Sequence, residues 1–320
     1  MNEKGIWLMQ DPSPERLEIL KAIAPEYRLV KGWGNETTDF PLEDIEIVFG
    51  WNIRKCAALL EIPNSRLMWI HAQSAGVDYM DLSLLKEKNI LLTSSSGIHA
   101  IPIAESVFGM LLSYTRGVRQ AILDQNIKQW HQKDKLIELQ ECTMMLVGTG
   151  HIGTRVGMMA KAFGMKTIGV NRSGREAENM DEIVMQQDMG THVKEADIVV
   201  NILPLTELTR HFFNETVFSQ MKEGTIFINV GRGSTVNTED LISALDTGKI
   251  AFAGLDVFEE EPLPAASPLW MRKDVLITPH ISGAVRHFKK LIFEIFEENL
   301  KAYVKGEELP RNKIDYERSY

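Results

Sequence analysis

The segment "TMMLVGTGHIGTRVGMMAKAFGMKTIGV", residues 143–170, decides how we expect the chain to fold. An apolar strand leads into Gly148, Gly150 and Gly153, which stand in the order GxGxxG, and an amphipathic helix and a second strand follow. In a unit of about thirty residues this order indicates a dinucleotide-binding turn. Gly148 makes the tight turn, Gly150 lets the backbone approach a pyrophosphate, and Gly153 lets the helix pack on the strand. The pyrophosphate would then lie on the amide groups of the helix N-terminus.

The residues after the second strand indicate which dinucleotide binds. Such a strand normally ends in an acidic residue that accepts hydrogen bonds from the ribose hydroxyls and repels a 2′-phosphate. Here the position holds Asn171, followed by Arg172 and Ser173. Asn171 removes the repulsion, while the guanidinium and the hydroxyl supply donors for a phosphate. We therefore predict NADP as the preferred cofactor, with NAD as the second choice. The alternative, that Arg172 is a solvated surface residue, stays open.

Short apolar strands alternate with amphipathic helices along the chain, which predicts parallel sheets covered by helices. Two longer helices, from Pro102 to Gln125 and from Val285 to Val304, mark the joins. We expect an α/β protein with two doubly wound parallel-sheet domains and a cleft between them. Residues 1–100 plus 285–320 would form a flavodoxin-like substrate domain, and residues 101–284 an inserted Rossmann dinucleotide-binding domain. The predicted strands span residues 6–9, 27–30, 45–50, 67–71 and 90–93, and then 143–148, 166–170, 197–203, 225–230, 250–257 and 275–280.

The composition of the 320 residues, with 44% apolar and 25% charged side chains, is that of a soluble globular protein. A net charge of −9 without a long basic run argues against nucleic acid and anionic membranes as partners. No signal-peptide stretch begins the chain, and no apolar run reaches the roughly 18 residues of a membrane helix. We therefore expect a cytoplasmic protein. Cys56 and Cys142 lack the spacing of a disulfide framework or a metal site, so no metal is expected.

Three polar or charged residues, Arg232, Glu261 and His280, each follow a predicted strand. The carboxyl ends of parallel strands meet at one edge of a sheet, so all three should face the cofactor. Taken singly, each has a common structural explanation: a surface arginine, a solvated acidic loop and a structural histidine. The three segments are "INVGRGSTVN" (228–237), "AGLDVFEEEPLP" (253–264) and "LITPHISGA" (276–284).

In this order, and together with "SAGVD" (74–78) and "NILPLTELT" (201–209), these motifs resemble the D-2-hydroxyacid dehydrogenase family over nearly the whole chain. The pattern is most similar to the branch of NADPH-dependent hydroxypyruvate and glyoxylate reductases. The resemblance implies hydride transfer between NAD(P)H and a small 2-keto acid, giving a D-2-hydroxy acid. It also implies a homodimer, assembled through the helix at residues 102–125 and the arm at residues 127–132.

The resemblance further implies a role for each site residue. His280 would donate a proton to the keto oxygen, and Glu261 would hold the imidazole and favour its protonated form. Arg232 would bind the substrate carboxylate and the oxygen being reduced. Backbone amides of Ala75 and Gly76 would hold the other carboxylate oxygen. Besides Gly148, Gly150, Gly153, Asn171, Arg172 and Ser173, the implied cofactor contacts are His151, Ile152, Leu203, Pro204, Val230, Gly231, Arg232, Asp256 (on the nicotinamide carboxamide), His280 and Gly283.

The sequence leaves the substrate open. Arg54 and Lys55, just beyond a strand, would suit a substrate phosphate and hence a phosphoglycerate dehydrogenase, although both equally suit a solvated helix start. A cofactor-sensing corepressor is a further alternative, which the complete set of Arg232, Glu261 and His280 disfavours. Trp51 follows its strand directly and would either limit the substrate side chain or pack under the loop.

Overall fold

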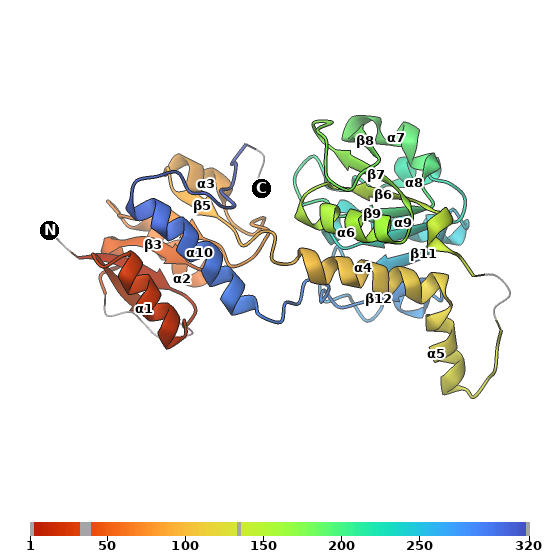
Figure 1. The fold of residues 1–320 in the computed structure, drawn as a ribbon, viewed down its shortest axis with the longest axis horizontal. Coiled ribbons are helices and arrows are strands. Elements are labelled where there is room, and N and C mark those ends of the chain that lie inside the picture. The colour runs from red at the N-terminus through yellow and green to blue at the C-terminus, as the bar shows by residue number, and fades with distance from the viewer. Residues whose placement is uncertain (1–2, 33–39, 133–135, 318–320) are drawn as a thin grey trace. The chain divides into compact units, whose positions relative to one another are not determined.

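The computed structural model describes residues 3–32, 40–132 and 136–317, and of residues 53–55 it describes only the backbone. The chain divides into two compact units (Figure 1). Unit 1 is formed by residues 1–98 and 285–320, and unit 2 by residues 99–284. Unit 1 is therefore built from both ends of the chain, and unit 2 is inserted into it.

The described part of unit 1 contains a five-stranded sheet in the order β2-β1-β3-β4-β5, with every neighbouring pair parallel. This order is flavodoxin-like. The strands are β1 (Lys4–Leu8), β2 (Tyr27–Lys31), β3 (Ile45–Phe49), β4 (Trp69–His71) and β5 (Leu91–Thr93); the helices are α1 (Pro14–Ile23), α2 (Ile53–Glu61), α3 (Leu82–Glu87) and α10 (Phe288–Val304), with a 3₁₀ turn at Leu42–Asp44.

Helices cover both faces of this sheet because side chains of its buried strands are apolar on both sides. On one face α10 lies beside α1 (Figure 1), and Arg16 of α1 forms an ion pair with Glu297 of α10, Nη1 to Oε2 2.6 Å. Phe293 of α10 stacks on Phe49 of β3 with ring centroids 4.4 Å apart. The other face packs against α2 and α3. Thus the C-terminal helix completes the core of the N-terminal sheet.

Unit 2 contains, among the described residues, a seven-stranded parallel sheet in the order β12-β11-β10-β9-β6-β7-β8. The strand order reverses at β6, which is where dinucleotides bind in Rossmann folds. The strands are β6 (Thr143–Val147), β7 (Lys166–Asn171), β8 (Glu182–Met185), β9 (Ile198–Asn201), β10 (Thr225–Asn229), β11 (Ile250–Leu255) and β12 (Val275–Ile277); the helices are α4 (Ala100–Thr115), α5 (Val118–Asn126), α6 (His151–Ala162), α7 (Met189–His192), α8 (Glu215–Gln220) and α9 (Thr238–Asp246). Short 3₁₀ turns lie at Leu139–Glu141, Gln186–Asp188, Val193–Glu195, Gly233–Thr235 and Pro268–Met271.

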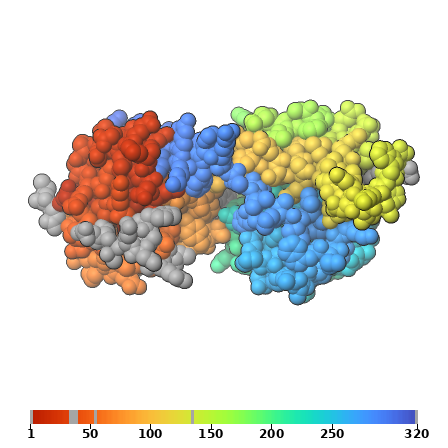
Figure 2. All heavy atoms as spheres, turned by 90° about the horizontal axis from the view of Figure 1, so that it is seen from below, coloured from red at the N-terminus to blue at the C-terminus, as the bar shows by residue number. Residues whose placement is uncertain are grey.

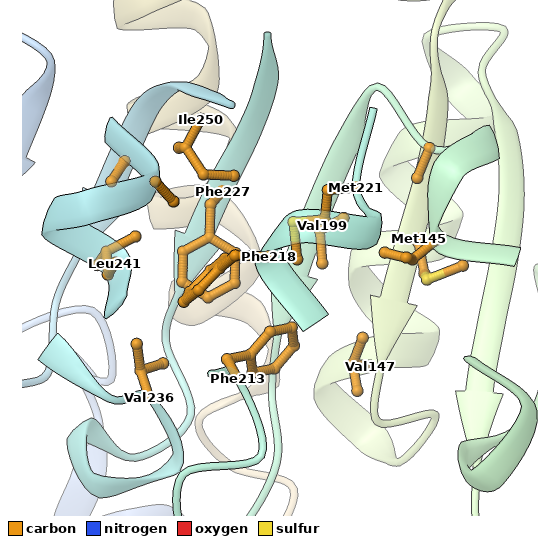
Figure 3. Close-up of a cluster of buried hydrophobic side chains, with 14 of the residues drawn as sticks. Met145, Val147, Val199, Phe213, Phe218, Met221, Phe227, Val236, Leu241 and Ile250 are labelled. Carbon is orange, nitrogen blue, oxygen red and sulfur yellow. The ribbon is translucent and has the colours of Figure 1, made fainter. Parts of the chain in front are cut away.

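Two apolar clusters sandwich this sheet. Figure 3 shows the one under α8 and α9, where Phe213, Phe218 and Phe227 pack between the strands and the helices. The opposite cluster buries one side of α4 and α6 against the same strands. Both units therefore have the doubly wound α/β architecture that the strand–helix alternation predicts, and the predicted fold class is confirmed.

The structure differs from the expected elements in two places. The helix predicted from Pro102 to Gln125 is two helices, because the chain turns at Gly117, which has a φ of 70°. The apolar spacing continues into α5 and conceals this break. An additional strand, β8, was not predicted, because only Val184 of its four residues is buried and the apolar signal is weak.

No helix among the described residues is long and apolar enough to cross a membrane. The two cysteines, Cys56 and Cys142, are buried and form no disulfide bond with each other. The expected cytoplasmic location stays a prediction.

Candidate functional site

The glycine-rich turn of unit 2 connects β6 to α6. Gly148 has a φ of 115°, and a Cβ on it would lie 3.2 Å from the carbonyl oxygen of Ile202. A Cβ on Gly153 would lie 2.1 Å from the carbonyl oxygen of Gly148, so helix and turn pack as closely as glycine permits. A Cβ on Gly150, by contrast, would have no heavy atom of the described chain within 4 Å, apart from the neighbouring residues of the turn itself. The turn thus leaves open space in front of the α6 N-terminus, which fits the pyrophosphate of a dinucleotide.

Asn171, at the end of β7, shapes the turn that follows it. Its Nδ2 donates hydrogen bonds to Oγ1 of Thr149 (3.1 Å) and to the carbonyl of Arg175 (2.8 Å). Its Oδ1 accepts from the backbone amide of Ser173 at 3.2 Å. Arg172 and Ser173 are exposed. The half-buried amide therefore joins the glycine-rich turn to the "NRSGR" turn, and an acid at this position would lose both donated bonds.

His280 and Glu261 form a direct pair in unit 2. Nδ1 of His280 lies 2.7 Å from Oε2 of Glu261, and Oε1 of Glu261 accepts from the backbone amide of Phe258 at 2.9 Å. An ionised carboxylate only accepts hydrogen bonds, so Nδ1 of His280 is the donor in this contact. The other ring nitrogen, Nε2, can then exchange a proton with a bound ligand. The His280 side chain is 53% exposed and that of Glu261 34%, so the pair is open to small molecules.

Asp256 holds the turn that presents His280, whose φ is 52°. The Asp256 side chain is fully buried. Its Oδ1 accepts from Oγ1 of Thr278 (2.6 Å) and the amide of Ile281 (3.0 Å), while Oδ2 accepts from the amide of Ser282 (3.0 Å) and from its hydroxyl. Both oxygens are thus engaged within the turn. The predicted contact of Asp256 with a nicotinamide carboxamide stays a prediction.

Arg232 follows β10 and begins the next turn along the sheet edge. Its carbonyl accepts from Oγ1 of Thr235 at 2.6 Å. The following residue, Gly233, packs against the backbone of Phe258, so that a Cβ would lie 1.8 Å from the Phe258 carbonyl oxygen. Since β10, β11 and β12 are parallel neighbours, the loops that carry Arg232, Glu261 and His280 leave the sheet at one edge.

The other predicted cofactor contacts of unit 2 also follow strands at this edge, either on loops or at the start of α6. Leu203 and Pro204 follow β9, and a Cβ on Gly231, after Val230, would lie 2.7 Å from the carbonyl oxygen of Leu203. His151 and Ile152 begin α6. The carbonyl of Gly283 lies 2.7 Å from Nδ1 of His99, a residue that the sequence did not single out.

In unit 1 the "SAGVD" loop follows β4 and is fixed by its own hydrogen bonds. Oγ of Ser74 donates to the carbonyl of Gly76 (2.8 Å) and lies 2.9 Å from the hydroxyl of Tyr79. The amide of Ser95 donates to the carbonyl of Ser74 at 3.0 Å. The backbone of Ala75 and Gly76 is thus held in one conformation. Ser74, Tyr79 and Ser95 were missed because the contact between the segments after β4 and β5 exists only in the folded sheet.

His71, at the end of β4, supports this loop from inside. It is fully buried, with Nδ1 2.8 Å from Oγ1 of Thr93 and Nε2 3.3 Å from Oγ of Ser95. Burial lowers the pKa of His71 to about 3, so the imidazole is neutral.

Trp51, also on this edge, is partly buried and packs against the core under α2 and α3. This packing is one of the two predicted roles of Trp51. The other, limiting the substrate side chain, stays a prediction. The side chains of Arg54 and Lys55 lie outside the described residues.

An open glycine-rich turn in a Rossmann unit fits a dinucleotide, and a histidine–carboxylate pair at the same sheet edge can transfer a proton, which are the two requirements of a nicotinamide-dependent dehydrogenase. Residues 108–282 match the profile of the D-isomer specific 2-hydroxyacid dehydrogenase family, NAD binding domain. The chain belongs to this family and is an NAD(P)-dependent oxidoreductase.

Three similar proteins illustrate the match. The glyoxylate reductase of Aeropyrum pernix is 33% identical over 99% of this chain and 97% of its own. The structure of phosphoglycerate dehydrogenase from Lactobacillus plantarum is 37% identical, covers 98% of this chain and 100% of its own, and has a TM-score of 0.58. A D-isomer specific 2-hydroxyacid dehydrogenase from Xanthobacter autotrophicus, solved with NADPH and MES, is 26% identical, with full coverage of both chains and a TM-score of 0.83.

Proposed function

We propose that the protein reduces a small 2-keto acid of the glyoxylate or hydroxypyruvate type to the D-2-hydroxy acid, with NADPH as the preferred reductant. The observation that carries the proposal is the 2.7 Å contact between Nδ1 of His280 and Glu261, which occupies Nδ1 and leaves Nε2 as the ring nitrogen that can take up and give a proton. The name of the Aeropyrum relative, a glyoxylate reductase, supports the substrate class.

Each residue of the set has a separate task in the proposed reaction. The bound nicotinamide supplies the hydride. Nε2 of His280 gives its proton to the keto oxygen, and the carboxylate of Glu261 stabilises the imidazolium before transfer. The Arg232 guanidinium binds the substrate carboxylate and stabilises charge on the oxygen. The amides of Ala75 and Gly76 bind the second carboxylate oxygen.

Gly148, Gly150 and Gly153, with the first turn of α6, would hold the pyrophosphate of the cofactor. The preference for NADPH rests on the "NRSGR" turn, where exposed Arg172 and Ser173 flank an uncharged Asn171. The Xanthobacter relative was solved with NADPH, which supports this choice. We retain NAD as a weaker cofactor, because the pyrophosphate contacts are the same for both.

A second candidate substrate is phosphohydroxypyruvate. The specific observation is the 37% identity to the phosphoglycerate dehydrogenase of Lactobacillus plantarum. The predicted phosphate contacts, Arg54 and Lys55, distinguish the two substrates: an Arg54→Ala, Lys55→Ala double variant should lose phosphohydroxypyruvate reduction selectively if that substrate is the natural one.

We further propose that the protein is a homodimer. Large apolar side chains are exposed along α5 and the arm after it, and Figure 2 shows this segment, in yellow, on the surface of unit 2. Trp130 is 92% exposed, and an isolated monomer would leave it in water. A second copy of the chain is the occupant we expect, and light scattering of wild type and Trp130→Glu tests it. The exposed apolar side chains are Val118, Ile122, Leu123, Ile127 and Trp130.

The decisive experiment for the proposed function is turnover with glyoxylate, hydroxypyruvate, phosphohydroxypyruvate, pyruvate and a branched keto acid, each with NADPH and with NADH. We expect the highest kcat/KM with NADPH and one of the first two acids. Absence of turnover with every acid would contradict the proposal and favour a cofactor-sensing role.

A further inference from the structure

Two glutamine side chains at the carboxyl edge of the unit 1 sheet have buried polar atoms without a hydrogen-bond partner. Gln10 lies two residues beyond β1 and is 9% exposed; Gln73 lies two residues beyond β4. Oε1 of Gln10 and Nε2 of Gln73 are inaccessible to solvent, and within the described part of the chain neither atom makes a hydrogen bond. One atom accepts and the other donates.

Such atoms call for an explanation, because a buried polar group without a partner destabilises the folded protein. Three further atoms of this kind belong to Trp7, Arg155 and His192, but none of these residues follows the carboxyl end of a strand. Ligands of parallel α/β sheets bind at that end. The position of the two glutamines is therefore the one at which a ligand would complete their hydrogen bonds.

Gly50 brings the two chain segments together. It follows β3, which lies between β1 and β4 in the sheet, and its amide donates to the carbonyl of His71 at 2.8 Å. A Cβ on Gly50 would lie 2.9 Å from Nε2 of Gln73 and 2.7 Å from Cβ of Met9, the neighbour of Gln10. The Gln73 amide nitrogen and Cβ of Met9 thus both lie next to Gly50, at the end of β3. Gly50, with a φ of 101°, leaves the room for them.

The same edge carries the backbone proposed to bind the substrate carboxylate. Gln73 directly precedes the fixed Ser74–Gly76 turn, whose conformation the Ser74 hydroxyl and Ser95 maintain. A keto acid bound through its carboxylate at Ala75 and Gly76 would carry its C3 substituent only a few bonds from that point. A hydroxyl group on C3 would both accept and donate a hydrogen bond.

We propose that Gln10 and Gln73 bind the C3 hydroxyl of a 3-hydroxy-2-keto acid, so that hydroxypyruvate is preferred to pyruvate and glyoxylate. Nε2 of Gln73 donates to the hydroxyl oxygen, and Oε1 of Gln10 accepts its proton. This inference rests on the proposed function and specifies its substrate. A site that hydrogen-bonds a hydroxyl disfavours the analogue without one, because its polar groups then stay unpartnered. We expect kcat/KM for hydroxypyruvate to exceed that for pyruvate by about 10- to 100-fold.

The test compares hydroxypyruvate and pyruvate, which differ by this hydroxyl alone, in wild type, Gln10→Met and Gln73→Met. Methionine keeps the length of the side chain and removes the amide. We expect each variant to lower kcat/KM for hydroxypyruvate by about 10-fold and to raise it for pyruvate, because the methyl group no longer meets an unpartnered amide. Both glutamines serve one hydroxyl, so the double variant should lose little more than either single variant. Gln187→Met, on the exposed surface of unit 2, is the matched control.

The two substrates separate recognition from structural damage. A purely structural role of the glutamines would lower both kcat/KM values in parallel, leave their ratio unchanged and overturn the proposal. A wild-type ratio near one would overturn it as well, while turnover itself would leave the proposed function intact. A wild type that reduces neither acid would overturn both.

Discussion

Gly233 and Phe258 touch so closely that no other residue fits at position 233. A Cβ on Gly233 would lie 1.8 Å from the carbonyl oxygen of Phe258 and 1.9 Å from its carbonyl carbon. Gly233 follows Arg232, and the amide of Phe258 binds Glu261. This contact therefore sets the spacing between the loop that carries the guanidinium and the loop that carries the carboxylate partner of His280.

We predict that Gly233→Ala separates these two loops and abolishes most of the activity. The obstacle is backbone rather than a flexible side chain, so relief requires a main-chain shift, at a cost of about 3 kcal/mol or more. Urea unfolding and kcat/KM measure the two effects. Gly109→Ala is the control: Gly109 lies inside α4 with nothing within 4 Å of its Cβ position among the described residues, and alanine there should stabilise by up to about 1 kcal/mol. Equal changes in unfolding free energy and kcat/KM for Gly233→Ala and Gly109→Ala would contradict the close contact between Gly233 and Phe258.

His280→Ala should lower kcat for keto-acid reduction by about 100-fold or more, the scale of losing a positioned acid. Glu261→Gln should cost less, because a neutral amide can still accept from Nδ1 of His280 but does not stabilise the imidazolium. Cofactor affinity, measured by fluorescence titration with NADPH, should change little in either variant. Wild-type turnover of His280→Ala at neutral pH would rule out the acid–base role.

The sequence predicted the doubly wound parallel sheets and the shared edge of Arg232, Glu261 and His280 from patterns along the chain, whereas the pairing of Glu261 with His280 was implied by the resemblance to the family. Strand–helix alternation and a GxGxxG turn after a strand leave few topologies, and residues that follow adjacent parallel strands must share an edge. The hydrogen bonds that support the site residues were not predictable in this way. That Asp256 binds Thr278 and Ser282, or that Ser95 supports Ser74, depends on side-chain reach across strands, for which the sequence carries no spacing rule.

Buried His71 should make the stability of the protein fall in mild acid. Its folded-state pKa, about 3, is below the ordinary value of about 6.5, so protons bind the unfolded chain more strongly. The stability that neutral His71 contributes is fully present above about pH 6.5 and is lost as the pH falls toward 3. At pH 5 the loss amounts to about 2 kcal/mol.

His71→Gln removes this titration and keeps a hydrogen-bonding side chain beside Thr93. The difference in unfolding free energy between wild type and variant, from urea titrations at pH 7.5 and pH 5, should therefore shrink at the lower pH. Acid titration of carboxylates is common to both proteins and cancels in the difference. A difference that is the same at both pH values would show that His71 titrates normally.

The last prediction concerns the turn after β7. If Arg172 and Ser173 bind a 2′-phosphate, wild type should show a higher kcat/KM with NADPH than with NADH, by about 10- to 150-fold for one charge-assisted contact of roughly 1.5–3 kcal/mol. Arg172→Ala should lower kcat/KM with NADPH and leave kcat/KM with NADH nearly unchanged. Asn171→Asp should lower kcat/KM with NADPH further, because the carboxylate repels the 2′-phosphate. Its gain in kcat/KM with NADH is limited, because the two hydrogen bonds that Asn171 donates to Thr149 and Arg175 are lost with the amide.

The double variant separates these contributions. Asn171→Asp with Arg172→Ala should reverse the cofactor preference, while Arg172→Lys should keep most of the NADPH preference, since a cation remains without the planar fork. Steady-state kinetics with both cofactors at fixed keto acid measure the ratios, and thermal unfolding of Asn171→Asp reports any loosening of the turn. Two outcomes would refute the assignment: a wild type that prefers NADH, or an Arg172→Ala variant that loses both cofactors equally. The second would mean that Arg172 packs on the adenine, which NADPH and NADH share.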